Sequence, residues 1–197
     1  MKRQRAGLHI GLAASLSLLL VATLTVPVSA SVTRFAKLER YSLRLMNCTR
    51  TGGWVRHDGT CRAYGSGKYS AYREPLELHR ELGDDVALPW AVEIAREDYC
   101  GHTLAGSSLD RRFERAGYRN RHRGENVGCS YAWSARTMVL RTHLMMQSEK
   151  AYRGWHWRQM KDADFRSAGI AVVQIGTRTR IVVDFYGLRE HRSAEAS

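Results

Sequence analysis

The sequence predicts an α+β domain, with helices over the first two-thirds of the chain and a β-hairpin near its end. Several segments before residue 160 have apolar residues at helical spacing. Two β-rich runs, 169–175 and 180–186, come later and are separated by four residues, Gly176-Thr-Arg-Thr179. Because strands do not alternate with helices along the chain, a parallel α/β fold is excluded. The chain has no internal repeat and no sign of a second domain.

The first 30 residues have the pattern of an export signal. A basic start at residues 2–5 precedes an almost wholly apolar run, and Val28-Ser-Ala30 places small residues where a signal peptidase cleaves. An uncleaved membrane anchor is the alternative, because no charged residue follows until Arg34. Pro27 and the small residues favour cleavage after residue 30, so we expect a secreted, extracellular protein with no membrane span after cleavage.

Removal of residues 1–30 leaves 167 residues, which suits one domain with a full-sized core. We expect this domain to span 31–187 and a frayed tail to cover 188–197. The net charge of +12 falls to +9 without the three basic residues of the signal. Outside the cytoplasm, anionic wall polymers or lipid headgroups are the natural polyanions. We therefore predict a monomer with no nucleic-acid partner, which recognises an extracellular lipid, cell-wall polymer or protein.

Four cysteines fit an oxidising compartment: Cys48, Cys61, Cys100 and Cys129. Three pairings of four cysteines are possible. We favour Cys48–Cys61 and Cys100–Cys129, because each bridge closes a local loop, and each would contribute about 3–4 kcal/mol by restricting the unfolded chain. A zinc site of four cysteines lacks support, since the chain has no C-x-x-C pair.

The first predicted helix covers residues 33–49 and stops at Gly52-Gly53, and a long surface loop follows as far as Pro75. The inner face of this helix carries Phe35, Leu38, Tyr41, Leu45 and Met46. A short helix is expected over 75–82, and another begins at Pro89 and runs towards Tyr99. A third covers 110–116 and ends at Gly117, which suits the residue after a helix.

The longest predicted helix spans residues 134–152, with Ser134 as its N-cap. At 100° per residue, Glu149 falls near the centre of an apolar arc formed by Met138, Val139, Thr142, Met145, Met146 and Tyr152. The opposite side carries Arg136, His143, Gln147 and Lys150. A carboxylate that faces a core needs a partner. We also expect the substitution Glu149→Leu to fold with equal or greater stability, because the core face would gain apolar area.

Two acid–imidazole pairs are the candidate chemistry. His102 lies two residues after Cys100 and Glu125 lies four before Cys129, so a bridge between these cysteines would bring them together. His156 follows Glu149 by seven residues and returns to the same side if the helix continues or kinks. Two imidazoles and two carboxylates suit a divalent metal or general acid–base chemistry. The alternative is structural: an arginine or backbone donors satisfy Glu149, and His156 packs between two tryptophans.

The other histidines read as surface residues: His57, His79, His122, His143 and His191. Common enzyme signatures are absent, because the chain has no H-E-x-x-H, no G-x-S-x-G and no G-x-G-x-x-G. A cysteine nucleophile is excluded if all four thiols are bridged.

Seven short motifs follow one another in the chain: Asn47-Cys-Thr-Arg50, Cys100-Gly-His102, Arg115-Ala-Gly-Tyr118, Gly124-Glu125-Asn126, Glu149-Lys-Ala-Tyr152, His156-Trp157 and Asp184-Phe-Tyr186. In this order and spacing they resemble the CAP superfamily (cysteine-rich secretory, antigen 5 and pathogenesis-related 1 proteins, with an SCP-like domain), especially its bacterial secreted members. The likeness covers most of residues 33–187. It departs from the family pattern at Trp155, at Gln159-Met160 and in the long loop 52–75.

The resemblance implies an α–β–α sandwich, in which a small antiparallel sheet lies between helical layers. It also implies that His102, Glu125, Glu149 and His156 line one open cavity. In many family members this tetrad binds a divalent cation, usually zinc, through the two histidines, and we name zinc as the possible cofactor here.

Three functions remain open at this point. The first is a secreted binding module whose His/Glu cavity holds a divalent metal. The second is a metal-dependent hydrolase of peptides or esters, in which catalytic Glu125 or Glu149 moves a proton. The third is a wall protein that binds polyanions through its basic surface alone. Two histidines without a third protein ligand bind metal weakly, which favours the first function over the second.

Overall fold

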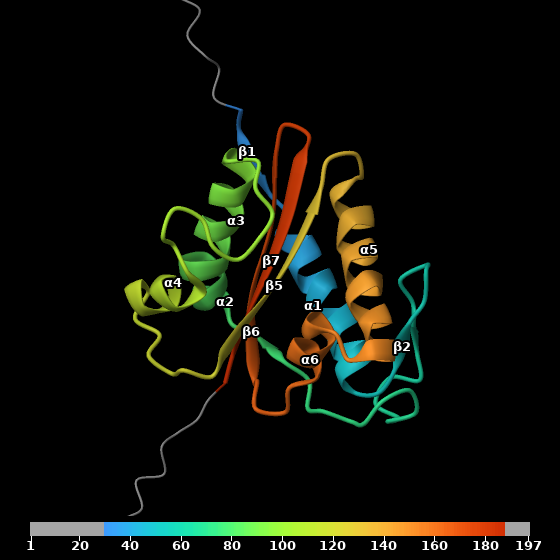
Figure 1. Ribbon diagram of the computed structural model, residues 1–197. Coiled ribbons are helices and arrows are strands. Elements are labelled where there is room, and N and C mark those ends of the chain that lie inside the picture. Colours follow the sequence, from blue (N-terminus) through green and yellow to red (C-terminus); the bar gives the residue numbers. More distant parts are fainter. Residues whose placement is uncertain (1–29, 188–197) are drawn as a thin grey trace, which may run out of the picture.

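The computed structural model describes residues 30–187 as a sheet between two layers of helices (Figure 1). The strands hydrogen-bond in the order β1-β6-β7-β5, and β4 adds a short parallel pairing to β6. Their bounds are β1 Val32–Arg34, β4 Glu77–Leu78, β5 Arg123–Ser130, β6 Ser167–Ile175 and β7 Arg178–Tyr186. A separate two-stranded ribbon consists of β2 Trp54–Val55 and β3 Cys61–Arg62. Strand β5 therefore forms one edge of the main sheet.

One helical layer packs on each face of the sheet. The first layer holds α1 Ala36–Arg50, α5 Ala135–Ser148, the 3₁₀ turn η2 Glu149–Tyr152 and α6 Trp155–Lys161. The second holds α2 Arg80–Leu82, the π-helical turn η1 Gly83–Ala87, α3 Leu88–Arg96 and α4 Leu109–Arg115. Figure 1 shows β5 passing between the two groups of helices. The expected α–β–α sandwich is confirmed.

The sheet has two apolar faces because its central strands are buried on both sides. On β6, Ile170 and Val172 face the core under α1, α5 and α6, whereas Ala171 and Val173 face α3. Such continuous apolar runs are typical of strands covered on both faces. The predicted hairpin is present, with Val172 of β6 opposite Ile181 of β7. The hairpin is thus the centre of the fold.

Several predicted helix bounds were wrong. The first helix begins at Ala36, because residues 32–34 pair with the end of β6 as β1. The segment 75–82 is not one helix, since Glu77 and Leu78 pair with β6 before the chain turns into α2. Helical structure then continues from α2 through η1 into α3, so Pro89 lies in the first turn of α3 but does not begin a separate helical run. The predicted bounds of α4 and the N-cap Ser134 of α5 agree closely with the structure.

Strand β5 was not predicted at all. Its sequence, Arg123-Gly-Glu-Asn-Val-Gly-Cys-Ser130, has two glycines and one β-branched residue, so it lacks the usual strand pattern. The glycines allow helices to approach: a Cβ on Gly128 would lie 2.4 Å from Thr142 of α5, and one on Gly124 would meet Gln159 of α6. Close packing of helices, and not β propensity, explains this composition.

Both favoured disulfides are present. Cys48–Cys61 ties the end of α1 to the loop 52–75, and Cys100–Cys129 joins the loop after α3 to β5. None of the helices within residues 30–187 is long and apolar enough to cross a membrane. The predicted signal, apart from its last residue, and the predicted tail lie outside the described residues.

The motif Asn47-Cys-Thr-Arg50 has a structural role. The Asn47 amide donates to the Leu76 carbonyl at 2.9 Å and accepts from the Leu76 N–H at 2.8 Å, as a paired strand would. Arg50 is fully buried and donates to four backbone carbonyls, those of Glu74, Met160, Asp162 and Phe165. The motif therefore holds α1 against the loop before β4 and the segment after α6.

Candidate functional site

The first predicted pair is formed by a loop histidine and a strand glutamate. His102 Nδ1 lies 2.7 Å from Glu125 Oε1, and the Cys100–Cys129 bridge holds the loop of His102 beside β5. The glutamate side chain is 1% exposed and the imidazole 46% exposed. A buried carboxylate therefore anchors a ring that solvent and ligands can reach.

An arginine that the sequence did not single out completes the first pair. Arg112 of α4 contacts the other oxygen of Glu125, with Nη2 2.6 Å from Oε2. Its guanidinium lies 3.9 Å from the centre of the Trp90 ring and donates to the carbonyl of His102 at 3.0 Å. Arg112 thus neutralises the buried carboxylate and positions the histidine backbone at the same time.

A second acid lies beside Glu125. Asp184 of β7 is its direct cross-strand neighbour and is fully buried. Burial and the negative charge of Glu125 raise the pKa of Asp184 well above its usual value, and the positive charge of Arg112 offsets this only in part. Neither carboxylate oxygen of Asp184 has a hydrogen-bond partner among residues 30–187, so the uncharged form of this buried acid is the less costly one.

The second predicted pair is built by a sharp reversal of the chain. Helix α5 ends at Ser148, η2 follows, and Arg153 adopts the left-handed conformation with φ 54° before α6 begins. His156 Nδ1 then lies 2.6 Å from Glu149 Oε1. Glu149 Oε2 accepts the backbone N–H groups of His156 at 2.9 Å and Trp157 at 3.3 Å. The buried charge is satisfied by one imidazole and the first turn of α6.

The turn between the two helices requires a residue without a side chain. A Cβ on Gly154 would lie 2.5 Å from Glu149 Oε2 and 2.6 Å from the Tyr152 ring. Glycine at this position therefore lets the glutamate reach the N-terminus of α6. The kink that the sequence allowed at Gly154 is present, and Glu149 has the partners that its position demanded.

The two pairs lie on either side of the edge strand β5. Alternate residues of a strand point to opposite faces, and Val127, two residues after Glu125, packs in the core beneath α3. Asn126 points the other way and donates to the carbonyl of His156 at 3.3 Å. Two adjacent residues of β5 thus connect to both pairs. Glu125 is itself the acid of the first pair, and Asn126 contacts the backbone of the second. That the pairs open into one cavity stays a prediction.

The polar side of α5 was misassigned. His143 and Gln147 are buried, whereas Met145 and Tyr152, placed on the apolar arc, are exposed. His143 Nε2 lies 3.0 Å from Thr49 Oγ1, and Gln147 bonds both the N–H and the carbonyl of Val55. Burial lowers the pKa of His143 to about 3, so the ring is neutral. These residues join α5 to α1 and β2, a polar contact inside the first helical layer.

The remaining histidines differ in their surroundings. His57 is exposed, as expected, and His79 accepts the N–H of Leu82 as the N-cap of α2. His191 lies outside the described residues. His122 is half-buried and stands with Asp162 and Asp164, and one ligand atom from each of the three lies within 4.8 Å of the others. Within residues 30–187 this is the one group of three or more such side chains that meets this distance.

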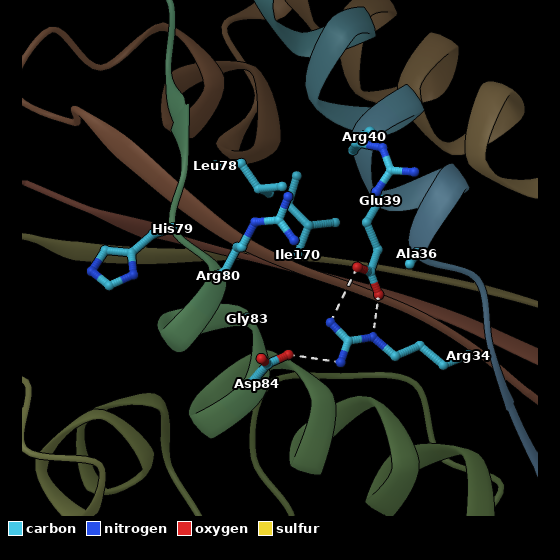
Figure 2. A pocket seen from close by; sticks show the side chains of 10 residues that line it. All are labelled: Arg34, Ala36, Glu39, Arg40, Leu78, His79, Arg80, Gly83, Asp84 and Ile170. Carbon is cyan, nitrogen blue, oxygen red and sulfur yellow. Dashed lines mark hydrogen bonds and ion pairs between the residues drawn. The ribbon is translucent and has the colours of Figure 1, made fainter.

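A charged pocket lies at the edge of the sheet away from β5, beside β1 and β4. It contains none of the predicted site residues. It measures about 240 Å³ and lies between the start of α1 and the start of α2. Figure 2 shows Arg34 between the carboxylates of Glu39 and Asp84, and its nitrogens lie 2.7 Å from each. The hydrogen bond to Glu39 raises the pKa of Arg34. This ion triad joins β1 and α1 to η1, which is a structural role.

Comparison with solved structures identifies the fold. The structure is similar to that of NaASP2, a hookworm Ancylostoma secreted protein, with a TM-score of 0.50 over 81% of this chain and 82% of that chain. The two proteins therefore share a fold. Sequence identity is 14%, and the NaASP2 crystal structure was determined with Zn²⁺. No protein-family model and no curated protein sequence matches the chain.

The chemistry of the two pairs suits a metal ligand set. In both, a buried carboxylate binds Nδ1, which leaves Nε2 as the nitrogen that can coordinate an ion. Carboxylates that accept from the other ring nitrogen are the usual supports of metal-binding histidines, because they fix the tautomer and raise the basicity of the ligand. Each histidine therefore offers its Nε2 as a ligand atom of the kind that suits a divalent cation.

Proposed function

We propose that this chain is a secreted CAP-type binding module of the bacterial kind, which holds a divalent cation through Nε2 of His102 and Nε2 of His156. Zinc is the first candidate, since imidazole nitrogen suits it well. The observation that carries the proposal is the shared geometry of the pairs, in which a buried glutamate fixes Nδ1 of each ring. Two protein ligands leave positions for water or for an atom of the bound partner.

The geometry favours binding over hydrolysis. A general base must offer a lone pair to the water that it deprotonates. Glu149 accepts one imidazole and two backbone N–H groups, and Glu125 is held between His102 and Arg112. Both glutamates are thus occupied in holding the histidines. The metal-dependent hydrolase remains the second candidate, and turnover of a peptide or ester would be its evidence.

The surface beside the second pair supports an amphipathic partner. Tyr152 and Trp155 flank the turn that leads to His156, and they are 71% and 56% exposed. Exposed aromatic rings offer apolar area together with a polar edge, which suits a lipid or a sugar ring of a wall polymer. Export is supported by the two disulfides and by the fold shared with a secreted protein.

The experiment is a calorimetric zinc titration of the purified protein and of its His102→Ala and His156→Ala variants. Each variant is expected to bind one zinc ion fewer than the wild type, and His57→Ala, at an exposed histidine, is the matched control. Equal zinc stoichiometry in wild type and both variants would contradict the metal site. Attachment to cell walls that high salt abolishes and both variants retain would favour binding through basic surface charge alone.

A further inference from the structure

A second group of potential metal ligands lies at the end of the sheet, outside both pairs. His122 precedes β5, whereas Asp162 and Asp164 belong to the segment between α6 and β6. His122 Nε2 lies 3.2 Å from Asp162 Oδ1, and one oxygen of each carboxylate and one nitrogen of the ring lie within 4.8 Å of one another. Two segments distant in sequence thus bring together three side chains of types that ligate metals.

The spacing of the His122 nitrogen and the Asp162 oxygen fits coordination as well as it fits an ion pair. In a tetrahedral zinc site with bonds of about 2.0–2.2 Å, neighbouring ligand atoms are about 3.3 Å apart. The 3.2 Å separation of the His122 and Asp162 atoms matches that value. A simple ion pair would need one carboxylate, and Asp164 supplies a second. The group therefore has the composition of a three-ligand site.

The backbone holds two of the three side chains in place before any ion arrives. The His122 N–H donates to Asn120 Oδ1 at 2.9 Å, and the His122 carbonyl accepts from Gly187 at 3.0 Å. The ring packs against Phe165 with centroids 4.6 Å apart. The carbonyl of Asp162 accepts from buried Arg50 at 2.9 Å. Ligands that are fixed in advance lose little conformational freedom on binding.

We propose that His122, Asp162 and Asp164 form a second divalent-cation site. One imidazole nitrogen and two carboxylate oxygens suit zinc or a similar borderline ion better than calcium or magnesium, which prefer oxygen alone. The side chains of His122 and Asp162 are 25% and 35% exposed and Asp164 is exposed, so water completes the coordination.

The position of this site gives it a structural consequence. His122 lies three residues before Glu125, and Asp162 lies one residue after the helix that carries His156. An ion between them would join the two segments on which the two acid–imidazole pairs stand. The site does not depend on the metal proposed for those pairs, since it shares no side chain with them.

The test uses zinc titration of the full chain in a background that carries both His102→Ala and His156→Ala. This background is expected to bind one zinc ion. Adding His122→Gln should weaken that binding by about 10–100-fold or more, since loss of even an indirect partner of a metal ligand costs that much. Adding His57→Gln, at an exposed histidine outside the group, should leave it unchanged. No zinc binding in the background, or binding that His122→Gln leaves intact, would overturn the proposal.

A second measurement covers the case in which the background variant does not fold. Imidazole nitrogen spectra of the wild-type chain, assigned with His122→Gln, should show Nε2 of His122 shifting on zinc addition. An unmoved His122 resonance at saturating zinc would overturn the site. Equal zinc stoichiometry in wild type and the double variant, with binding lost in His122→Gln, would instead remove the paired site and leave this one standing.

Discussion

The two acid–imidazole pairs have the same contact but differ in what holds the acid. Charged and polar side chains surround Glu125: Arg112 binds one oxygen, and Asp184 lies across the strand. Backbone groups hold Glu149, because the first N–H groups of α6 donate to it. The first arrangement joins side chains from α4, β5 and β7. The second lies within one short stretch of chain, residues 149–157.

This difference predicts different sensitivities. A buried charge held by another charge depends on that single partner, and its removal leaves the acid without compensation. A charge held by backbone donors depends on the shape of the turn and on its own acceptor oxygens. The two pairs should therefore respond to different substitutions, although their imidazole contacts differ by only 0.1 Å, 2.7 Å against 2.6 Å.

The largest effect is expected for Arg112→Ala. This change removes the guanidinium from the buried Glu125 carboxylate and from the Trp90 ring. Loss of one partner of a buried ion pair costs about 3–5 kcal/mol of unfolding free energy. Urea unfolding measures it, with Arg115→Ala at an exposed position of the same helix as the control. A loss equal to that of the control would show that Glu125 does not need the arginine.

An intermediate effect is expected for Glu149→Leu. The sequence alone suggested that leucine would be tolerated or stabilising, but the structure leads to the opposite prediction. Leucine would leave the N–H groups of His156 and Trp157 without an acceptor, and each unsatisfied buried donor costs about 1–3 kcal/mol. Urea unfolding of Glu149→Leu beside Glu149→Gln, which keeps an acceptor oxygen, separates this cause from loss of charge. A leucine variant as stable as the glutamine variant would contradict the capping role.

The parts of the site that the sequence predicted are those formed by local or disulfide-linked segments. Both imidazole contacts were predicted, one from the proposed bridge Cys100–Cys129 and one from the seven-residue spacing of Glu149 and His156. Both predictions concern segments that are either close in sequence or joined by a disulfide. The roles assigned to these four residues stay predictions. The α+β class was predictable because the hairpin 167–186 has a clear strand pattern.

The parts that the sequence could not supply depend on packing between distant elements. Arg112 is one of several arginines in its region, and nothing in its helix distinguishes the one that reaches β5. The glycines of β5 obscure its strand pattern in the sequence. They are needed there because helices pack closely against the strand. His143 was placed on a solvated face, since its partner Thr49 lies 94 residues away. Asp184 did carry a signal that was missed, a charge in the middle of an apolar strand.

The smallest effect is expected at Asp184. The raised pKa of Asp184 means that the folded protein keeps a proton that the unfolded chain releases above about pH 4. Stability from this group is therefore full below about pH 4 and is lost as pH rises through the folded pKa. An asparagine at this position would mimic the protonated acid, because it is uncharged and has nearly the same size and shape. We expect Asp184→Asn to be as stable as the wild type at acid pH and more stable at neutral pH.

The measurement is urea unfolding of wild type and Asp184→Asn between pH 4 and pH 8, with Asp110→Asn at an exposed position as the control. The difference in unfolding free energy between Asp184→Asn and wild type should grow with pH, and the control should show no such trend. A difference that shrinks as pH rises would mean that the folded protein holds Asp184 ionised. In that case Arg112 would compensate two carboxylates, and the first pair would depend on this arginine more heavily still.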